Sequence, residues 1–470
     1  MVTVPSATLT GRILMGFSDT DLIPLVDEGL GNSSYLVDLG DGRALAVDAS
    51  RDLRALRRAA DRRGLAVAFA ADTHLHADFL SGAVQLQHDT GATILASAAG
   101  RRAFDHVGLH DGDEVDLGGL RLRALTTPGH TDEHVAFLLT ENDREIGVFT
   151  GGSLIVGSAA RTDLSGAGRT DELARAQYHS LRRVAALPEE VAVWPTHGAG
   201  SFCSAPPGAQ RVTTVGAQKR DNPLLAAPDE DTFVSMLIDS LGSYPAYFSR
   251  LPEHNRRGPG LLPPDLHLAD LNVEDVKRLL AAGAAIVDVR PAETFAQGHI
   301  PGAVSIPLRD QFATWLGWVL EDTVALVFVT DDDQDLSEIS WQSYKIGYER
   351  LAGRLAGGMA AWQSAAEPSQ HVVFARAERL DDRPFLDVRQ AAEYAAGHVA
   401  GALHIELGVL ADHAHEVPHG AVIACGHGER AMTAASVLQR KGVNDLTVLD
   451  GGPADYAAAH HRAIATGLTG

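Results

Sequence analysis

Apolar runs alternate with polar segments along the first half of the chain. Residues 34–49 predict two paired strands around the turn Gly40-Asp41-Gly42. The charged segment 52–63 predicts a helix, which Gly64 ends. Further strands are expected over residues 65–70, 92–96 and 120–126. Alternating strands and helices of this kind predict an α/β fold.

The second half of the chain repeats itself. The segment from Ile286 to Arg290 returns as the segment from Phe385 to Arg389, and both end in Asp-Val-Arg. A Gly-His phrase also occurs twice, at Gly298 and at Gly397, with the same spacing from its Asp-Val-Arg. The period of about 100 residues is too long for a solenoid unit, so it predicts two tandem domains.

Length and boundary signals then divide the chain into domains. The 470 residues suit about three domains, and a hydrophobic content of 45% is normal for a globular protein. A Pro/Gly-rich stretch, residues 256–264, marks a boundary, and Asn272 caps the helix that follows it. We therefore predict domains over residues 1–255, 268–366 and 370–470.

Charge and cysteine content restrict the partners and the compartment. The net charge of −22 argues against nucleic acid and anionic membrane surfaces. No apolar run approaches the ~18 residues of a membrane span, and Met1 to Gly16 lack the pattern of a secretory signal. The two cysteines, Cys203 and Cys425, are too few for a disulfide framework, so a cytoplasmic protein is expected.

Two histidine motifs in the first domain predict a metal site. The first, His74-Leu75-His76-Ala77-Asp78, follows an apolar strand, and alternate residues there are expected to converge on one point. The second, Thr127-Pro128-Gly129-His130, bends sharply and offers another imidazole. Imidazoles with a carboxylate suit zinc or iron rather than magnesium or calcium.

This pair of motifs resembles the metallo-β-lactamase superfamily, in its glyoxalase II and persulfide dioxygenase branch. The resemblance implies an αββα sandwich, with His74 and His130 binding the metal while His76 and Asp78 complete or orient its shell. His197 stands where the family has its last histidine, and it is the fifth candidate ligand.

Two positions depart from the family pattern. Gly152 stands where the family has an aspartate ligand, and Phe79 stands where glyoxalase II enzymes have a histidine for a second metal. A dinuclear hydrolase needs both residues, so thioester hydrolysis is disfavoured. Persulfide dioxygenases have no populated second site, so Phe79 does not count against that activity, whereas Gly152 does. A mononuclear site built on His74, His76 and His130 stays open.

Two more residues of this domain are candidates for substrate binding. The phrase from Gly198 to Cys203 resembles persulfide dioxygenases that are fused to rhodanese domains, which implies that Cys203 lies near the metal and handles sulfur. A buried, inert cysteine is the alternative. Arg161 matches an arginine that is thought to hold the glutathione part of the family's substrate. A surface ion pair is its alternative.

The repeated phrases of the second half resemble the rhodanese family. In the second copy a strand, residues 422–424, leads into Cys425 and then a helix over 431–440, which resembles the rhodanese active loop. Glycines let backbone N–H groups face an anion, and a helix N-terminus adds positive potential; both favour the thiolate of Cys425. Arg430 is expected to pair with a sulfite or sulfonate group. The candidate substrate-binding residues of this loop are Gly426, His427, Gly428 and Glu429.

The first copy lacks this chemistry. Thr330 aligns with Cys425, and Asp335 aligns with Arg430. Four aspartates between positions 331 and 335 would repel an anionic sulfur donor, so we predict a catalytically inactive domain with a structural role. The Asp-Val-Arg phrases are expected to form buried or half-buried ion pairs in both copies.

The whole chain resembles a persulfide dioxygenase fused to tandem rhodanese domains. That implies oxidation of a thiol persulfide by O2 to sulfite with one Fe(II) per chain, and transfer of sulfane sulfur through Cys425 to or from sulfite and thiosulfate. Zinc shares these ligands, and no metal is expected if the site is degenerate. Two alternatives stay open: a sulfurtransferase with a non-catalytic metal domain, and a metal-dependent hydrolase. The aromatic-rich run 312–320 predicts core or an interface, which permits a homodimer.

Overall fold

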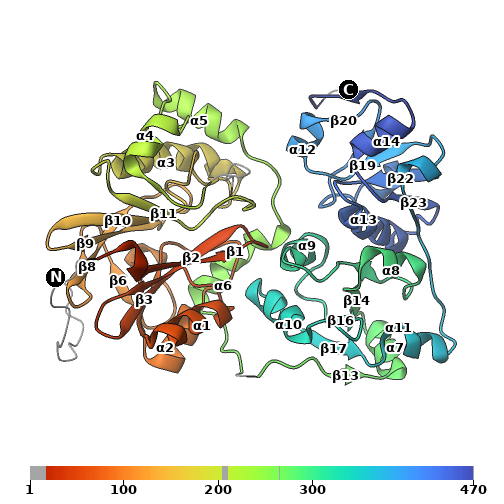
Figure 1. The fold of residues 1–470 in the computed structure, drawn as a ribbon, viewed down its shortest axis with the longest axis horizontal. Coiled ribbons are helices and arrows are strands. Elements are labelled where there is room, and N and C mark those ends of the chain that lie inside the picture. Colours follow the sequence, from red (N-terminus) through yellow and green to blue (C-terminus); the bar gives the residue numbers. More distant parts are fainter. Residues whose placement is uncertain (1–16, 204–209, 264, 469–470) are drawn as a thin grey trace. The chain divides into compact units, whose positions relative to one another are not determined.

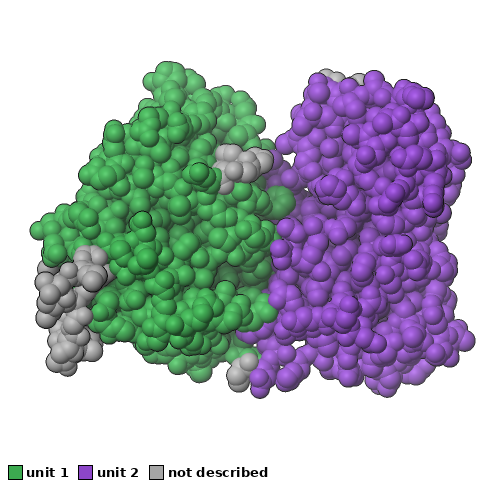
Figure 2. All heavy atoms as spheres, in the orientation of Figure 1, with its two compact units in different colours: residues 1–241, 246–264, 344–347 green, residues 242–245, 265–343, 348–470 purple. Residues whose placement is uncertain are grey.

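The computed structural model describes residues 17–203, 210–263 and 265–468. These residues form two compact units (Figure 2); the first takes residues up to 241, 246–264 and 344–347, and the second takes 242–245, 265–343 and 348–470. The segment Met1 to Gly16, which lacks the pattern of a secretory signal, lies outside the described residues. Within the described ranges, no helix combines the length and the apolar character that a membrane crossing requires.

Two mixed sheets form the centre of the first unit (Figure 1), and each has six strands within the described residues. The first sheet contains β1 (Leu22–Asp27), β2 (Asn32–Asp38), β3 (Arg43–Val47), β4 (Ala66–Asp72), β5 (Thr93–Ser97) and β6 (Val107–Leu109), in that order. The second contains β7 (Glu114–Asp116), β8 (Leu120–Thr126), β9 (Val135–Glu141), β10 (Arg144–Gly151), β11 (Ala192–Pro195) and β12 (Thr213–Thr214), also in sequence order.

The sheets pack face to face because their strands are apolar on both sides. Tyr35, Leu45 and Phe69 of the first sheet share one buried cluster with Leu122 and Phe137 of the second. The outer face of the first sheet packs on α1 (Arg54–Arg63) and α2 (Ala83–Thr90). The outer face of the second packs on α3 (Thr170–Ala185), α4 (Val215–Asp221) and α5 (Glu230–Asp239). The predicted αββα sandwich is confirmed, and α6 (Leu251–Arg257) follows it along the chain.

The second unit holds the two repeats, and each builds a five-stranded parallel sheet in its described residues. The first sheet has the order β13 (Asp270–Leu271), β17 (Leu351–Leu355), β16 (Leu326–Val329), β14 (Ala285–Asp288) and β15 (Val304–Ser305). The second has the order β18 (Val373–Ala375), β23 (Leu446–Leu449), β22 (Ala421–Ala424), β19 (Phe385–Asp387) and β21 (Leu403–His404). Two short strands, β20 (His398–Val399) and β24 (Ile464–Ala465), pair outside this sheet. Because the two strand orders correspond element by element, the sequence repeat is also a structural repeat.

Helices cover both sheets of the second unit. The first repeat carries α7 (Val273–Ala281), α8 (Ala292–Gln297), α9 (Phe312–Val319), α10 (Leu336–Lys345) and α11 (Gly358–Ser364). The second carries α12 (Ala391–Ala396), α13 (Glu429–Arg440) and α14 (Pro453–Ala459). The predicted Asp-Val-Arg ion pairs are confirmed in both copies, with Nη2···Oδ2 distances of 2.6 Å for Arg290–Asp288 and 2.7 Å for Arg389–Asp387.

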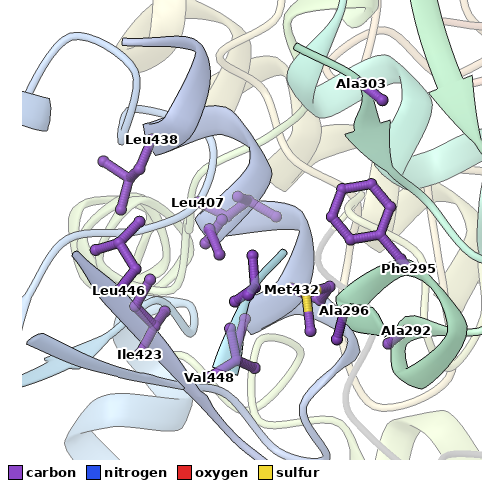
Figure 3. Close-up of a cluster of buried hydrophobic side chains, with 14 of the residues drawn as sticks. Ala292, Phe295, Ala296, Ala303, Leu407, Ile423, Met432, Leu438, Leu446 and Val448 are labelled. Atoms are coloured by element: carbon purple, nitrogen blue, oxygen red, sulfur yellow. The ribbon is translucent and has the colours of Figure 1, made fainter. Parts of the chain in front are cut away.

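The two repeats share one continuous apolar core, part of which is drawn in Figure 3. Met432 of α13 lies close to Phe295 and Ala296 of α8 in this cluster. The backbone of Ser305 in β15 is tied to the same helix, since its N–H donates to Ser436 Oγ at 3.1 Å and its carbonyl accepts from Thr433 Oγ1 at 2.7 Å. Helix α13 therefore follows the loop that contains Cys425 and also packs at the seam between the repeats.

The aromatic-rich run forms α9, as its helical spacing predicted. Phe312 and Leu316 are fully buried, and the Trp318 ring lies against the backbone of Gly408 in the second repeat. A Cβ atom at Gly408 would stand 2.2 Å from that ring, so only glycine permits the contact. The prediction of core or interface is confirmed, with the second repeat as the surface that α9 covers.

Candidate metal centre and sulfur-transfer loop

The candidate metal ligands sit on loops at strand ends of the two packed sheets. His74 follows β4, and the loop start is fixed by Asp48 at the end of β3, which accepts from the N–H of Thr73 at 2.7 Å and from its hydroxyl at 2.8 Å. His130 follows β8, and its N–H donates to Gln177 Oε1 at 2.9 Å. His197 follows β11. Loops anchored on a double-sheet core can hold three side chains in fixed positions.

Three imidazoles meet in this region. One ring nitrogen each from His74, His130 and His197 lies within 4.8 Å of the others, and all three side chains are about 1% exposed. Among the described side chains, the Nε2 atoms of these three residues are buried without a hydrogen-bond partner. A buried nitrogen is costly to leave unpaired, so three that converge on one point fit a bound cation.

The other nitrogen of each ring, Nδ1, has a hydrogen-bond partner, so the free lone pair of each ring is on Nε2. His130 Nδ1 donates to the Arg161 carbonyl at 2.7 Å. The Thr73 hydroxyl gives its proton to Asp48 and accepts from His74 Nδ1 at 2.8 Å. His197 Nδ1 lies 3.2 Å from Asn32 Oδ1. With Nδ1 as donor, the unprotonated nitrogen is Nε2, and a metal-binding histidine has this arrangement.

The pKa values of His74 and His130 agree with a neutral ring that has a free Nε2, whereas the pKa of His197 does not. Burial lowers the pKa of His74 well below its ordinary value, and it lowers that of His130 to about 3. Burial would also lower the pKa of His197, but neighbouring Cys203 and Asp78 outweigh it and hold the pKa well above the ordinary value. His74 and His130 are therefore neutral at physiological pH and ready to bind a cation.

The other two sequence candidates, His76 and Asp78, lie beside this triad. His76 Nε2 is 3.2 Å from Asp48 Oδ1, and its ring stacks on Phe79 with centroids 4.2 Å apart. Asp78 groups instead with His197 and Cys203. The ring centroids of His74 and His76 are 4.1 Å apart, and His76 Nδ1 is buried without a hydrogen-bond partner among the described side chains. Residues 73–82 form a loop, and the expected convergence of His74, His76 and Asp78 on one point is not tested by these contacts. Their metal roles stay predictions.

Gly152 explains how the centre is arranged without the family's aspartate. A Cβ at this position would stand 2.6 Å from His130 Cδ2 and 2.8 Å from Ala160 Cβ, so the His130 ring fills the space next to it. The Gly152 N–H donates to His134 Nε2 at 3.0 Å, which gives His134 a structural role. The space that a carboxylate side chain at position 152 would need is therefore already taken by neighbouring side chains.

Gly152→Asp is expected to destabilise the first unit instead of restoring a ligand. The new side chain must displace the His130 ring or the backbone, and overpacking of this kind costs about 1–3 kcal/mol. Chemical denaturation followed by hydrogen exchange in β8 and β10 measures the loss. Gly168→Asp is the matched control, since a Cβ there meets nothing within 4 Å. Unchanged stability with a gain in metal affinity would contradict the prediction.

Arg161 connects the triad to Cys203. It is 1% exposed, and its guanidinium donates to Asp163 at 2.7 Å and to the Phe202 carbonyl at 2.8 Å. Its own N–H donates to the Cys203 carbonyl at 3.3 Å, and its carbonyl accepts from His130. The alternative of a surface ion pair is wrong in one respect, because the pair with Asp163 is buried on the arginine side. Binding of substrate by Arg161 stays a prediction.

Several residues that hold the centre were not recognised in the sequence. Asp48 and Asn32 orient His76, His197 and the start of the metal loop. Asn255, from α6, is 1% exposed and holds the same loop with three hydrogen bonds, to the carbonyls of His76 and Phe79 and from the N–H of Ser81. Of these, Asp48 had a visible signal, since it directly follows a predicted strand.

Replacing Asn255 with alanine is expected to lower the free energy of unfolding of the first unit by at least about 2 kcal/mol. Two buried carbonyls and one buried N–H would lose their partner, and each such loss costs about 1–3 kcal/mol before relaxation. Urea denaturation with hydrogen exchange in residues 73–82 reports the change. Asn444→Ala, at an exposed position, serves as control and should leave the transition in place.

The candidate sulfur-transfer loop lies between β22 and α13. Cys425 is 2% exposed, and its Sγ accepts from the Gly428 N–H at 3.2 Å. Gly428 has φ +88°, and a Cβ there would stand 2.9 Å from the Phe374 ring, so the turn requires glycine. One backbone donor and the N-terminus of α13 thus lie next to the sulfur.

The remaining loop residues divide into paired and exposed groups. Arg430 forms a bidentate pair with Glu393, at 2.6 and 2.7 Å, and its guanidinium carbon lies 5.5 Å from the Trp315 ring centroid. Glu429 pairs with Arg309 of the first repeat at 2.7 Å. His427 is exposed at the loop surface, next to Gly426. The expected pairing of Arg430 with a sulfite group therefore competes with Glu393, and it stays a prediction.

The corresponding loop of the first repeat has another construction. Thr330 takes the place of the cysteine and is 5% exposed. Gln334 closes the loop, since it accepts from the Asp331 N–H at 3.0 Å and donates to the Val289 carbonyl at 2.7 Å. Asp335 accepts from the N–H of Ser337 at the start of α10. Gln334 and Asp335 thus bind groups of the same region, and the structural role of this repeat stays a prediction.

Comparisons with known proteins match different parts of the chain to different families. The rhodanese-like domain family matches residues 272–365 and 375–459. A hydroxyacylglutathione hydrolase of Methylococcus capsulatus is 34% identical over 37% of this chain and 64% of its own length, so the chain spans less than two thirds of that relative. A probable metallo-hydrolase of Burkholderia pseudomallei is 30% identical over 43% of this chain and 80% of its own.

A solved structure extends the similarity across both units. A metallo-β-lactamase from Staphylococcus aureus is 29% identical, with a TM-score of 0.62 over 71% of this chain and 98% of its own length. The curated relatives and this structure agree with the sandwich of the first unit, and the family match agrees with the two repeats of the second. The chain therefore belongs to the metallo-β-lactamase-fold enzymes, and it joins that fold to two rhodanese-like domains.

Proposed function

We propose that this chain is a persulfide dioxygenase joined to a sulfurtransferase. Its first unit would oxidise a low-molecular-weight thiol persulfide, such as glutathione persulfide, with O2 to sulfite. Its last domain would carry sulfane sulfur on Cys425. The observation that carries the proposal is the presence in one chain of three converging unpartnered imidazoles and a thiol that accepts a backbone N–H at a helix start.

The donor set of the first unit supports a redox-active metal. His74, His130 and His197 offer three nitrogens, which suit iron(II) and also zinc. Bound iron would supply the reaction with O2 at this centre. The residues of the chain do the rest: Thr73, the Arg161 carbonyl and Asn32 hold the rings, and the buried surroundings exclude bulk water. The overall reaction, RSSH + O2 + H2O → RSH + SO3²⁻ + 2 H⁺, balances without a further reductant.

Sulfur transfer would follow two displacement steps at Cys425. The thiolate attacks the outer sulfur of a persulfide, the S–S bond of the donor breaks, and the thiol carrier leaves with the electron pair while a cysteine persulfide forms. Sulfite then attacks the terminal sulfur, thiosulfate leaves and the thiolate is restored. Gly428 N–H and the start of α13 stabilise negative charge on Sγ in both steps. Because one chain carries both sites, sulfite would form at a high effective concentration near its acceptor.

Two other functions have a specific observation in their favour. Gly152 favours a sulfurtransferase whose first unit no longer catalyses a reaction, since the position has no ligand. Curated relatives named as hydroxyacylglutathione hydrolases favour a metal-dependent hydrolase. The second is weakened by Phe79, whose ring stacks on His76 where a second-metal ligand would be needed.

Oxygen consumption separates the three functions. Purified protein reconstituted with iron(II) is mixed with glutathione persulfide in an oxygen electrode, and sulfite is measured at the end. The proposed dioxygenase consumes one O2 for each sulfite formed. Absence of oxygen consumption together with sulfur transfer from thiosulfate to cyanide would leave only the sulfurtransferase. Hydrolysis of a glutathione thioester with no oxygen consumption would establish the hydrolase instead.

A further inference from the structure

The guanidinium of Arg430 is already paired where it lies at the sulfur-transfer loop. Glu393 Oε2 accepts from Arg430 Nη1 at 2.6 Å, and Glu393 Oε1 accepts from Arg430 Nη2 at 2.7 Å. A Cβ atom at Gly426 would stand 3.7 Å from Arg430 Nη2, so this pair lies beside the residue that follows Cys425. The guanidinium also lies over the Trp315 ring, with Cζ 5.5 Å from the ring centroid. A carboxylate and an indole therefore hold Arg430 at the loop.

The pair between Glu393 and Arg430 is ionic at neutral pH. Burial alone would raise the pKa of the Glu393 carboxyl, but the hydrogen bonds and the charge of Arg430 outweigh burial and hold this pKa below its ordinary value. The Gln390 N–H also donates to Glu393 Oε2 at 3.3 Å. One negative charge thus cancels the positive charge that Arg430 would otherwise offer to an anion.

Two other guanidinium groups near the loop are paired as well. Arg389 Nη2 lies 2.7 Å from Asp387 Oδ2, and Arg309 Nη2 of the first repeat lies 2.7 Å from Glu429 Oε2. In each pair a carboxylate cancels the charge of the guanidinium. What remains for an anion is the Gly428 N–H and the N-terminus of α13, which is equivalent to roughly half a positive charge. The loop is therefore poorly suited to a donor with two negative charges.

The first repeat shows that the carboxylate accompanies the arginine. Glu393 aligns with Thr294, since each stands four positions before the Gly-His phrase of its repeat. Asp335 aligns with Arg430 in the same comparison. In this chain the glutamate therefore occurs only in the copy that also has the arginine and Cys425. This is expected if Glu393 serves the transfer loop and not the fold that both repeats share.

We propose that Glu393 determines the donor specificity of the loop: by neutralising Arg430 it favours organic persulfides over the thiosulfate dianion. An organic persulfide carries at most one negative charge at its reacting end, whereas thiosulfate brings two toward a thiolate. With either donor the Cys425 thiolate attacks the sulfane sulfur, the S–S bond of the donor breaks, and the carrier thiolate or sulfite leaves with the electron pair. The inference deepens the sulfur transfer proposed above and rests on it.

Glu393→Gln tests this role, because glutamine keeps the length of the side chain and one acceptor for Arg430 but removes the negative charge. The full-length protein is mixed without oxygen with an excess of thiosulfate or glutathione persulfide. The mass of the intact protein then reports persulfide formation at Cys425 with time, and Cys425→Ser corrects for sulfur bound elsewhere. We expect the ratio of the second-order rate constants, thiosulfate over persulfide, to rise about 10-fold, the size of one charge–charge interaction near a protein surface.

Glu274→Gln is the matched control. It makes the same charge change at a side chain of α7 that is 80% exposed, and it should leave the ratio unchanged. An unchanged ratio in Glu393→Gln, or an equal fall with both donors, would overturn the proposal, because a purely structural carboxylate affects both donors alike. Absence of persulfide formation with both donors in the wild-type protein would instead refute the sulfurtransferase itself.

The wild-type protein provides a second measurement if Glu393→Gln does not fold. Its rate constant with thiosulfate should rise with added salt, since salt screens the repulsion of a dianion by a loop without uncompensated positive charge. A rate constant that stays constant or falls with salt would overturn the proposal, because it would show that a free positive charge attracts thiosulfate.

Discussion

Cys425→Ser is expected to abolish sulfur transfer while leaving the first unit intact. Serine keeps the hydrogen bond from Gly428 and the packing of the buried loop, but its hydroxyl is a poor nucleophile toward sulfur at neutral pH. The rate of transfer from thiosulfate to cyanide should fall on the order of 10³-fold or more, as expected when the only nucleophile is removed. Formation of thiocyanate with time measures this rate directly.

The repeat supplies the control for this experiment. Thr330→Ser makes a comparable change at the corresponding position of the first repeat, where we predict no catalysis. That variant should transfer sulfur at the wild-type rate. Oxygen consumption of Cys425→Ser with iron and glutathione persulfide should also stay at the wild-type level. Loss of transfer in Thr330→Ser, or its persistence in Cys425→Ser, would contradict the assignment of one active repeat.

Elements with a local signal could be predicted from the sequence. The helix that Gly64 ends, the strand over 120–126 and the repeated Asp-Val-Arg pairs all depend on neighbours within a few positions along the chain. The same holds for the loop around Cys425, because its glycine and the following helix lie within a few residues. Hydrophobic spacing and turn residues determine such features before any tertiary contact forms.

Side-chain directions at the site could not be predicted in that way. The alternation argument placed His76 next to His74, and their ring centroids are 4.1 Å apart, but it could not show that Asp48, 28 positions earlier, holds His76 Nε2. Arg430 was expected to face an anion, yet Glu393, 37 positions earlier, holds it with two hydrogen bonds. Both outcomes depend on partners that only the folded sheets bring together. The sequence pattern therefore identified residues that gather at each site, but not the contacts that orient them.

The absence of a ligand at position 152 was visible in the sequence, but its consequence was not. From the pattern alone, glycine suggested an incomplete site. In the folded chain the His130 ring occupies the adjacent space, and Cys203 stands close to His197 from a loop more than 70 positions away from His130. Where a motif lacks one metal ligand, the fold can thus bring other donor atoms close to the site from segments outside that motif.

His130→Ala is the second change for which a large effect is expected. It removes one of three converging nitrogens and leaves the cation with two imidazoles in a buried place, so metal affinity should fall at least about 100-fold. Oxygen consumption with glutathione persulfide should be lost with the metal. Iron and zinc content per chain, measured by mass spectrometry after reconstitution and desalting, reports the change. Sulfur transfer through Cys425 should continue, because its loop contains no part of this centre.

An exposed histidine provides the control for that variant. His110→Ala removes an imidazole whose side chain is 78% exposed and should leave the metal content unchanged. Retention of metal by His130→Ala at the wild-type level would show that the three-imidazole group is not the metal centre.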